Sequence, residues 1–173
     1  QGWEDAPQSI APDRLDHPAQ GVSWQDAQFF CNWLTLKERQ EGRLTSTQYY
    51  RLPTDDEWTK AAAGSPRSFP GNYAGPEART DRWPANLPTR DAGDPFPETA
   101  PVGSFEPAPS GLYDLGGNAL EWVEDVFGNS PRGDENGMRR PCTLRGGSWA
   151  VNGEAERPAD QRVKARQNRR RAD

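Results

Sequence analysis

Carboxylate and amide side chains gather in two places in the middle of this sequence. Asn86, Asp91 and Asp94 form the first group, and Asp114 and Glu121 flank a double glycine in the second. Carboxylate, amide and turn-exposed carbonyl oxygens are the ligands that calcium takes, about six to eight at a time. Asp and Asn also cap turns without a metal, so the spacing alone leaves calcium sites and ordinary turns as alternatives.

The cysteines and the single histidine exclude several other kinds of site. Cys31 and Cys142 are too few for a disulfide scaffold or for a zinc site made of cysteines. His17 has no histidine neighbours, which excludes a metal centre held by several histidines. We interpret His17 as a solvated turn residue and Cys31 as a small buried hydrophobic residue on a helix.

Two helices are predicted from their capping boxes. The first covers about residues 23–40, where Ser23 can cap the helix and Asp26 can reach back to it. The second begins at Thr54, has Glu57 three residues later, and ends before the next glycine. These helices must position the loops that carry the acidic groups.

Most of the remaining chain is predicted to be irregular. The sequence has 17 Gly and 17 Pro, and residues 64–110 show no apolar periodicity, which is unusual for a compact domain unless something holds the loops in place. Residues 142–149 are typical of a short strand that ends in a tight turn. The segment 149–172 has only two branched aliphatic residues, so we predict an exposed, largely irregular surface segment there.

The composition indicates one small domain. The chain has 173 residues and a mean hydropathy of -1.04, but seven Trp, six Phe and four Tyr can supply the core. Nothing in it is typical of a membrane span or a signal peptide, so we expect a soluble fragment and leave its compartment open. Residues 139–173 carry ten Lys or Arg against four Asp or Glu, which gives them a net charge of +6. Because the whole chain has a net charge of -5, residues 1–138 have a net charge of -11. No aromatic residue follows Trp149 in this basic segment, which disfavours nucleic acid as the partner.

Six short motifs follow one another in the order Val22-Ser23-Trp24 with Asp26-Ala27, Arg51-Leu52-Pro53-Thr54 with Glu57-Trp58, Thr99-Ala100-Pro101-Val102-Gly103, Gly111-Leu112-Tyr113-Asp114, Gly117-Asn118 with Glu121-Trp122, and Arg145-Gly146-Gly147-Ser148-Trp149. In this order they resemble the formylglycine-generating-enzyme and sulfatase-modifying-factor family. The resemblance covers residues 17–149 well and the tail loosely. It implies an α+β fold of the C-type-lectin-like kind, with two main helices, short strands and long loops pinned by calcium.

The resemblance also implies two structural calcium sites, and calcium is the only cofactor that we expect. Each site would combine two side chains with two main-chain carbonyls, and waters or further carbonyls would complete the shell. The implied ligands are the side chains of Asn86, Asp94, Asp114 and Glu121 and the carbonyls of Leu87, Phe96, Gly117 and Ala119.

One departure from the family concerns catalysis. Catalytic members carry two cysteines shortly after the Gly-Gly-Ser-aromatic motif, where the thiolates bind copper and hold the substrate cysteine. This sequence has Val151 and Glu156 there, so we expect neither copper binding nor formylglycine generation. The related iron-dependent sulfoxide synthases need several histidines, so iron is not expected either. A pyoverdine-maturation oxidase of the same family works without the cysteine pair, which leaves an enzyme of another kind open.

The resemblance therefore favours a non-catalytic binding or sensor module that contacts a protein or other macromolecule. The alternatives are a metal-dependent oxidoreductase-type enzyme with a different active site, and a purely structural domain. Bacterial relatives are attached to kinases, and in receptors diversified by retroelements the segment after this turn is the variable ligand face. The ligand surface would contain Trp149, Asn152, Glu154, Glu156, Arg157, Asp160, Arg162 and Arg166, although scattered surface charge is the commoner explanation for any one of the polar members.

The ends of the sequence also differ from the family pattern. Family members carry further strands before the Asp-His-Pro segment and finish with an Asn-x-Gly-Phe-Arg strand. We therefore expect residues 1–173 to form a single domain that lacks N-terminal strands and the last C-terminal strand. Such a domain would be part of a larger polypeptide or assembly.

Overall fold

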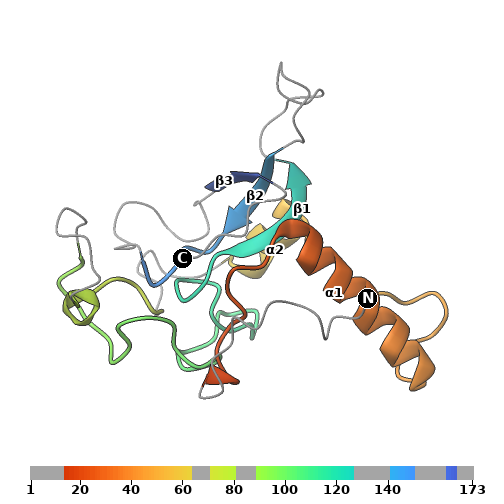
Figure 1. The fold of residues 1–173 in the computed structure, drawn as a ribbon, viewed down its shortest axis with the longest axis horizontal. Helices are drawn as coiled ribbons and strands as arrows, with labels where there is room; N and C mark the ends of the chain where they lie inside the picture. Colours follow the sequence, from red (N-terminus) through yellow and green to blue (C-terminus); the bar gives the residue numbers. More distant parts are fainter. Residues whose placement is uncertain (1–13, 64–70, 81–88, 127–140, 151–162, 167–173) are drawn as a thin grey trace.

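The computed structural model describes residues 14–63, 71–80, 89–126, 141–150 and 163–166, and within them it contains helices and one small sheet (Figure 1). The helical elements are α1 (Trp24–Gln40), α2 (Asp55–Ala61) and the short 3-10 helix η3 (Pro76–Ala78). The strands are β1 (Glu121–Val126), β2 (Pro141–Arg145) and β3 (Val163–Arg166). This arrangement confirms the predicted α+β class.

Both predicted helix starts are confirmed by their hydrogen bonds. The Ser23 hydroxyl accepts from the Asp26 amide and the Asp26 carboxylate accepts from the Ser23 amide, at 3.1 and 2.9 Å. Thr54 and Glu57 make the same reciprocal pair at the start of α2, at 3.2 and 2.8 Å. Each box satisfies amides that have no partner inside the helix. The α-helical part of α2 ends at Ala61, two residues earlier than predicted, because the chain then tightens into a turn.

The sheet has the order β1-β2-β3, and both pairings are antiparallel. Trp122 lies opposite Leu144 in the first pairing, and Leu144 lies opposite Val163 in the second. Strand β3 is a regular stretch that was not predicted within residues 149–172, and most of that segment lies outside the described residues. Four residues are too short for a reliable apolar pattern, and main-chain hydrogen bonds to β2 hold β3 in place.

The core consists of two hydrophobic clusters around the sheet. Trp58 from α2 packs with residues such as Leu115 and Val123 in the first cluster. Trp122, Cys142 and Leu144 form the second, which the beginning of α1 covers. Indole N–H groups in this region reach main-chain carbonyls, as Trp24 does to Val123 at 3.0 Å. The predicted role of the aromatic residues in the core is thus confirmed for these tryptophans.

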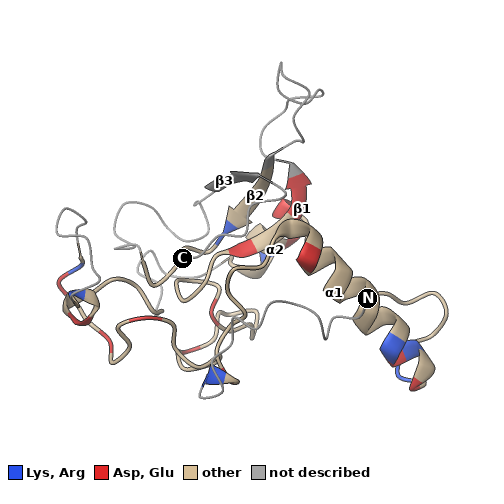
Figure 2. Cartoon of the chain, viewed as in Figure 1, with Lys and Arg blue, Asp and Glu red and all other residues tan. Residues whose placement is uncertain are grey.

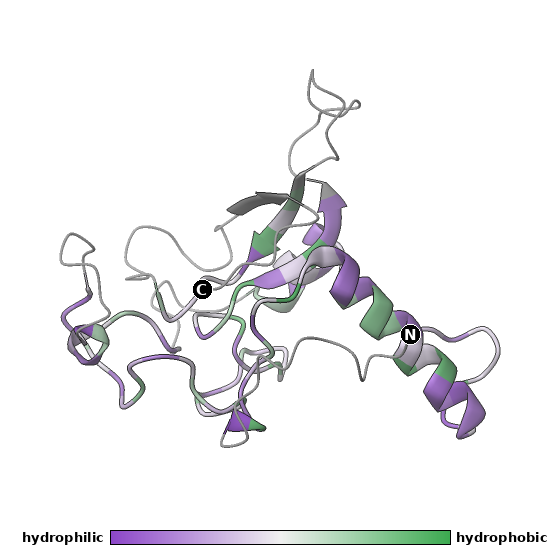
Figure 3. Ribbon diagram, in the orientation of Figure 1, coloured by the Kyte–Doolittle hydropathy of each residue, from purple (hydrophilic) through white to green (hydrophobic). Residues whose placement is uncertain are grey.

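Helix α1 extends away from the sheet (Figure 1), and hydrophobic and hydrophilic residues alternate along it (Figure 3). Phe29 and Leu36 are 66% and 61% exposed, and Thr35 is the only buried residue of the helix. Cys31 is half-buried rather than buried, because its stripe of α1 is only partly covered; this partial burial raises the pKa of its thiol. Figure 2 shows the acidic start and basic end of α1, which complement the helix dipole.

Within the part of the chain that the structure describes, no helix has both the length and the apolar character that a membrane span requires.

Candidate metal and ligand sites

The irregular segments meet at Asn118, a buried residue with a positive φ of 60°. Its side-chain amide accepts from the Ala100 amide at 2.9 Å and donates to the Ala100 carbonyl at 3.2 Å. Its own main chain donates to the Asn72 carbonyl at 2.8 Å and accepts from the Trp149 amide at 3.1 Å. Through its side chain and its main chain, this one residue joins three segments that are distant in the sequence, and so supplies hydrogen-bond partners to irregular backbone.

The glycines beside Asn118 are needed for close contact between main chains. A Cβ atom at Gly117 would lie 2.2 Å from the Asn72 carbonyl oxygen, and Gly117 has a φ of +76°. A Cβ atom at Gly71 would lie 2.0 Å from the Gly116 carbonyl oxygen. Since no other residue fits such a contact, the double glycine fixes the position of the acidic residues on either side of it.

The second predicted calcium site lies beside this junction. Asp114, Ala119 and Glu121 line one cavity of about 580 Å³, whereas Gly117 does not line it. One oxygen of Asp114 accepts from the Gly103 amide at 2.7 Å, and its other oxygen, Oδ1, is buried without a hydrogen-bond partner. The structure therefore brings three of the four predicted ligands to one place, with a carboxylate oxygen that lacks a partner.

The carboxyl group of Glu121 is under electrostatic strain, because burial disfavours its charged form. Desolvation is the main cause that raises the pKa of Glu121 to about 7, and the negative charge of Asp114 adds to it. A hydrogen bond from the Trp58 indole and the charge of Arg145 act in the opposite direction. A divalent cation between Asp114 and Glu121 would relieve this strain, so the residues present fit a calcium ion.

Only half of the first predicted calcium site lies within the described residues, because Asn86 and Leu87 fall outside them. Asp94 Oδ1 accepts from the Phe96 amide at 2.9 Å, and Oδ2 is buried without a hydrogen-bond partner, 3.6 Å from Arg90. Desolvation is again the main cause that raises the pKa of the Asp94 carboxyl. The described half of this site thus resembles the second site in having an unsatisfied carboxylate oxygen.

Neither site gathers many charged ligands. Among the residues that are described, no three His, Cys, Asp or Glu side chains come close enough together to hold a metal ion. Binding at either site would therefore depend on main-chain carbonyls as well as on its carboxylates, which is the mixture that calcium tolerates and that zinc does not favour.

A buried arginine in the Gly-Gly-Ser-Trp turn connects the sheet to α2. The Arg145 side chain is 0% exposed, stacks 4.4 Å from the ring centre of Trp58, and donates to Asp55 and Thr59. Sequence reasoning did not assign a role to Arg145, Trp58 or Asp55. The membership of Arg145 and Trp58 in the six motifs was the available signal, but the contact with Asp55 depends on the packing of α2 against the sheet.

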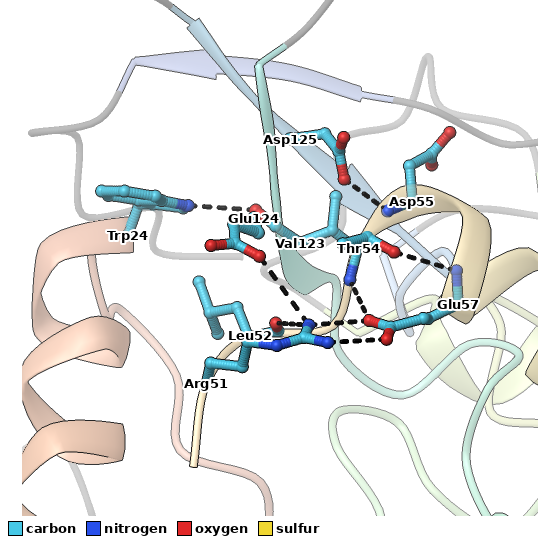
Figure 4. A network of polar contacts seen from close by, with 9 residues as sticks. All are labelled: Trp24, Arg51, Leu52, Thr54, Asp55, Glu57, Val123, Glu124 and Asp125. Carbon is cyan, nitrogen blue, oxygen red and sulfur yellow. Dashed lines mark hydrogen bonds and ion pairs between the residues drawn. The ribbon is translucent and has the colours of Figure 1, made fainter. Parts of the chain in front are cut away.

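A second ionic network covers the other side of α2 (Figure 4). Arg51 donates to both carboxylate oxygens of Glu57 at 2.7 Å, and Glu124 lies 3.7 Å from Arg51. Asp125 accepts from the amide of Asp55 at the helix start. These contacts fix the entry of α2 against β1, although surface exposure limits their contribution to stability.

The two cysteines and the histidine lie in the folded core or at its edge. Cys142 is buried in β2 and Cys31 lies half-buried on α1. His17 is not solvated as predicted, since its ring is mostly buried and Nδ1 lies 2.9 Å from the Thr99 hydroxyl. A threonine 82 residues away supplies this partner, which no local pattern could indicate.

Most of the predicted ligand surface lies outside the described residues, namely Asn152, Glu154, Glu156, Arg157, Asp160 and Arg162, as does Val151. Two members lie within them. Trp149 is half-buried and its amide bonds to the Asn118 carbonyl, and Arg166 is at the end of β3, opposite Pro141. The predicted surface therefore begins at the Asn118 junction and reaches the sheet edge.

Comparison with known proteins gives the same family as the motifs. The model of the "Sulfatase-modifying factor enzyme 1-like domain" matches residues 3–172. The formylglycine-generating enzyme of Thermomonospora curvata is 34% identical over 163 residues, which are 84% of this chain and 48% of that protein. The inactive C-alpha-formylglycine-generating enzyme 2 of Mus musculus is 38% identical over 148 residues, 83% of this chain and 41% of that protein.

A third relative is a kinase. The serine/threonine-protein kinase pkn1 of Chlamydia pneumoniae is 34% identical over 152 residues, which are 81% of this chain and 20% of the kinase. The chain thus spans about half or less of the length of these curated relatives.

Solved structures agree on the fold. The structure of PvdO from Pseudomonas aeruginosa matches with a TM-score of 0.61 and 26% identity over 90% of this chain and 58% of that one. Treponema denticola variable protein 1 matches with a TM-score of 0.59 and 23% identity over 94% of this chain and 71% of that one. From the motifs, the fold and these relatives, the chain belongs to the sulfatase-modifying factor enzyme 1-like family, which includes the formylglycine-generating enzymes.

Proposed function

We propose that this domain is a non-catalytic binding module that is stabilised by calcium and presents a ligand surface after the Gly-Gly-Ser-Trp turn. The observation that carries the proposal is the absence of thiols after this turn, where the sequence has Val151 and Glu156. The two cysteines of the chain lie on α1 and in β2 instead. Without a thiolate, neither copper binding nor capture of a substrate cysteine can occur there.

Two comparisons support a module without catalysis. A relative whose name describes it as inactive is among the most similar proteins, at 38% identity. The fold is also shared with a variable protein, although at 23% identity that likeness concerns the fold alone. The similarity to part of a kinase supports a role within a larger polypeptide. The family fold is thus compatible with functions other than formylglycine generation.

The absence of formylglycine generation is tested with a substrate peptide that contains the sulfatase-type cysteine motif. The purified domain is incubated with the peptide, copper and oxygen, and the peptide mass is measured. We expect no conversion, whereas a catalytic relative such as the enzyme of Thermomonospora curvata serves as the positive control. Conversion by this domain would contradict the proposal.

The calcium part of the proposal is supported by the buried Asp114 Oδ1, which has no hydrogen-bond partner, and by the desolvation that raises the pKa of Glu121. If calcium binds, about a hundredfold excess over its dissociation constant stabilises the fold by about 2.7 kcal/mol. For a domain of this size that corresponds to a melting temperature higher by about 5–10 °C than in chelator.

A double variant tests whether the second site is responsible. Asp114→Asn with Glu121→Gln should remove most of the calcium-dependent rise in melting temperature, because both charged ligands are lost. The matched control is Glu106→Gln, which removes an exposed carboxylate elsewhere. Equal melting curves with calcium and with chelator for the unaltered domain would refute the calcium proposal.

The ligand surface is tested through its arginines. Guanidinium groups suit carboxylates on another protein, so replacing Arg157, Arg162 and Arg166 together by alanine should weaken partner binding and barely change the melting temperature. If these arginines instead tie the tail to the acidic remainder of the domain, stability should fall while binding is unaffected. That second outcome would make the segment structural.

An enzyme of another kind is the alternative. The cavity with Asp114 and Glu121 favours it, because a carboxyl group with a pKa near 7 is suited to proton transfer. The binding module and the enzyme differ in the role that each gives to Glu121 when calcium is present. Calcium bound at Glu121 would occupy this group and exclude it as a general base.

A further inference from the structure

A second cavity, of about 620 Å³, has four aromatic residues in its walls, and the proposed function assigns a role to none of them. It lies between the segment that precedes α2, the helix itself and the segment that leads to Leu115. We call it the tyrosine cavity and define it by its aromatic walls, which are Tyr49, Tyr50, Trp58 and Tyr113. It shares Tyr113 and Glu121 with the cavity at the second calcium site, but it is distinct from the ligand surface after Trp149, so the inference does not rest on that surface.

The tyrosine rings are available at the surface, and at least one of them is fixed. Tyr49 is 64% exposed and Tyr113 is 53% exposed. Tyr50 is held by α1, since its amide donates to the Thr35 hydroxyl at 2.8 Å and its hydroxyl donates to Glu38 at 2.6 Å. Exposed aromatic rings with a fixed neighbour are typical of binding sites, because little conformational freedom is lost when a ligand enters.

The polar groups of the tyrosine cavity are acidic on balance. Glu57 and Glu121 line it, and Arg51 is its basic lining residue. Both oxygens of Glu57 hold Arg51, and Glu124 is a further carboxylate 3.7 Å from the same guanidinium. The positive charge of Arg51 is therefore neutralised, and because two carboxylates, Glu57 and Glu124, share this one guanidinium, one negative charge remains at the edge of the cavity whether or not Glu121 binds calcium. Residues 1–138, which include the whole cavity, carry a net charge of -11.

Aromatic faces combined with negative charge attract a cation, because the π face of an aromatic ring is itself negative. The domain makes this contact within its own described residues. Lys37 lies 5.0 Å from the ring centre of Trp33, Arg90 lies 5.0 Å from that of Tyr73, and Arg145 stacks on Trp58. From these features we propose that the tyrosine cavity binds an arginine side chain that a partner polypeptide presents. Arginine suits it better than lysine, since a planar guanidinium stacks on rings and is less strongly hydrated.

Binding is tested with synthetic peptides and the unaltered domain in calcium-containing buffer. The probe is an acetylated, amidated peptide of four Gly-Arg repeats, and two matched peptides carry citrulline or leucine in place of arginine. Citrulline keeps the shape of arginine but lacks its charge. We expect the arginine peptide to bind at least about fivefold more tightly than either control. Equal or tighter binding of the leucine or the citrulline peptide would overturn the proposal.

Variants of Tyr49 and Tyr113 separate ring contacts from general charge attraction. Tyr49→Leu and Tyr113→Leu should each lower the affinity for the arginine peptide about two- to fivefold. Tyr49→Phe and Tyr113→Phe should retain this affinity because the ring remains. Glu106→Gln serves as a control for the overall negative charge. If the leucine variants bind as well as the unaltered domain, the peptide is held by net charge alone and the proposed site is wrong. Melting curves of all variants show whether the fold is retained.

Discussion

Helix α1 is regular but mostly half-buried or exposed, whereas the irregular segment 98–120 contains core residues. Usually the regular elements of a domain are the ones that supply its core. The 17 residues of α1 form the longest regular element described, yet a single residue of it is buried. The irregular segment contains buried residues such as Ala100, Leu115 and Asn118. In this domain the core thus depends on loops that hydrogen bonds and glycine contacts hold together, and less on its longest helix.

The largest expected effect concerns Asn118. Asn118→Ala removes both partners of the Ala100 main chain and places alanine at a φ of 60°. We expect the free energy of unfolding to fall by about 4 kcal/mol, since two buried groups lose their hydrogen bonds. Urea unfolding measures it, with Asn32→Ala on the exposed side of α1 as the control. Similar losses of unfolding free energy for Asn118→Ala and Asn32→Ala would contradict the view that the loop region contributes more to the core than α1 does.

Substituting two glycines that both have a positive φ distinguishes the cost of a close contact from the cost of the backbone conformation. Gly117→Ala places a Cβ atom 2.2 Å from the Asn72 carbonyl oxygen, whereas Gly42→Ala, at a φ of +72°, meets no atom within 4 Å. We expect about 3 kcal/mol of destabilisation for Gly117→Ala and about 1 kcal/mol for Gly42→Ala. The difference in unfolding free energy measures the contact between the loops. Equal losses would mean that positive φ alone explains both.

The loop region should also respond to pH through Glu121. Its folded-state pKa of about 7 lies above the ordinary value of about 4.3, so the folded state binds the proton more tightly. Without calcium, stability should therefore fall as the pH rises from about 4.5 to 7 and then level off. Glu121→Gln should flatten this part of the profile and raise stability at pH 8. A Glu121→Gln profile identical to that of the unaltered domain would contradict the assignment.

The smallest effect is expected on α1, where Leu36 is 61% exposed. Leu36→Ala should change the free energy of unfolding by no more than about 0.5 kcal/mol. The same substitution at Leu115, which is 5% exposed in the loop region, should cost about 3 kcal/mol. Thermal or urea unfolding of the two variants side by side gives the sharpest form of the comparison. A large loss at Leu36 would show that α1 contributes to the core.

The features that the sequence predicted are those that depend on neighbouring residues. Capping boxes involve residues three positions apart, so Ser23 and Thr54 could be assigned correctly. The strand before the Gly-Gly turn was found from its composition, and the order of the six motifs gave the family. The calcium ligands were carried over from that resemblance. Three of them, Asp114, Ala119 and Glu121, share one cavity, and calcium binding itself stays a prediction.

The features that only the tertiary structure decided join residues far apart in the chain. Trp58 and Glu121 are 63 residues apart, and Arg145 and Asp55 are 90 apart. Cys31 on α1 was also predicted to be buried, but whether a helix face is covered depends on what packs against it. Local sequence determines which backbone groups a residue can cap. Which distant segment supplies a partner or covers a face depends on how the loops close, and that is a property of the whole fold.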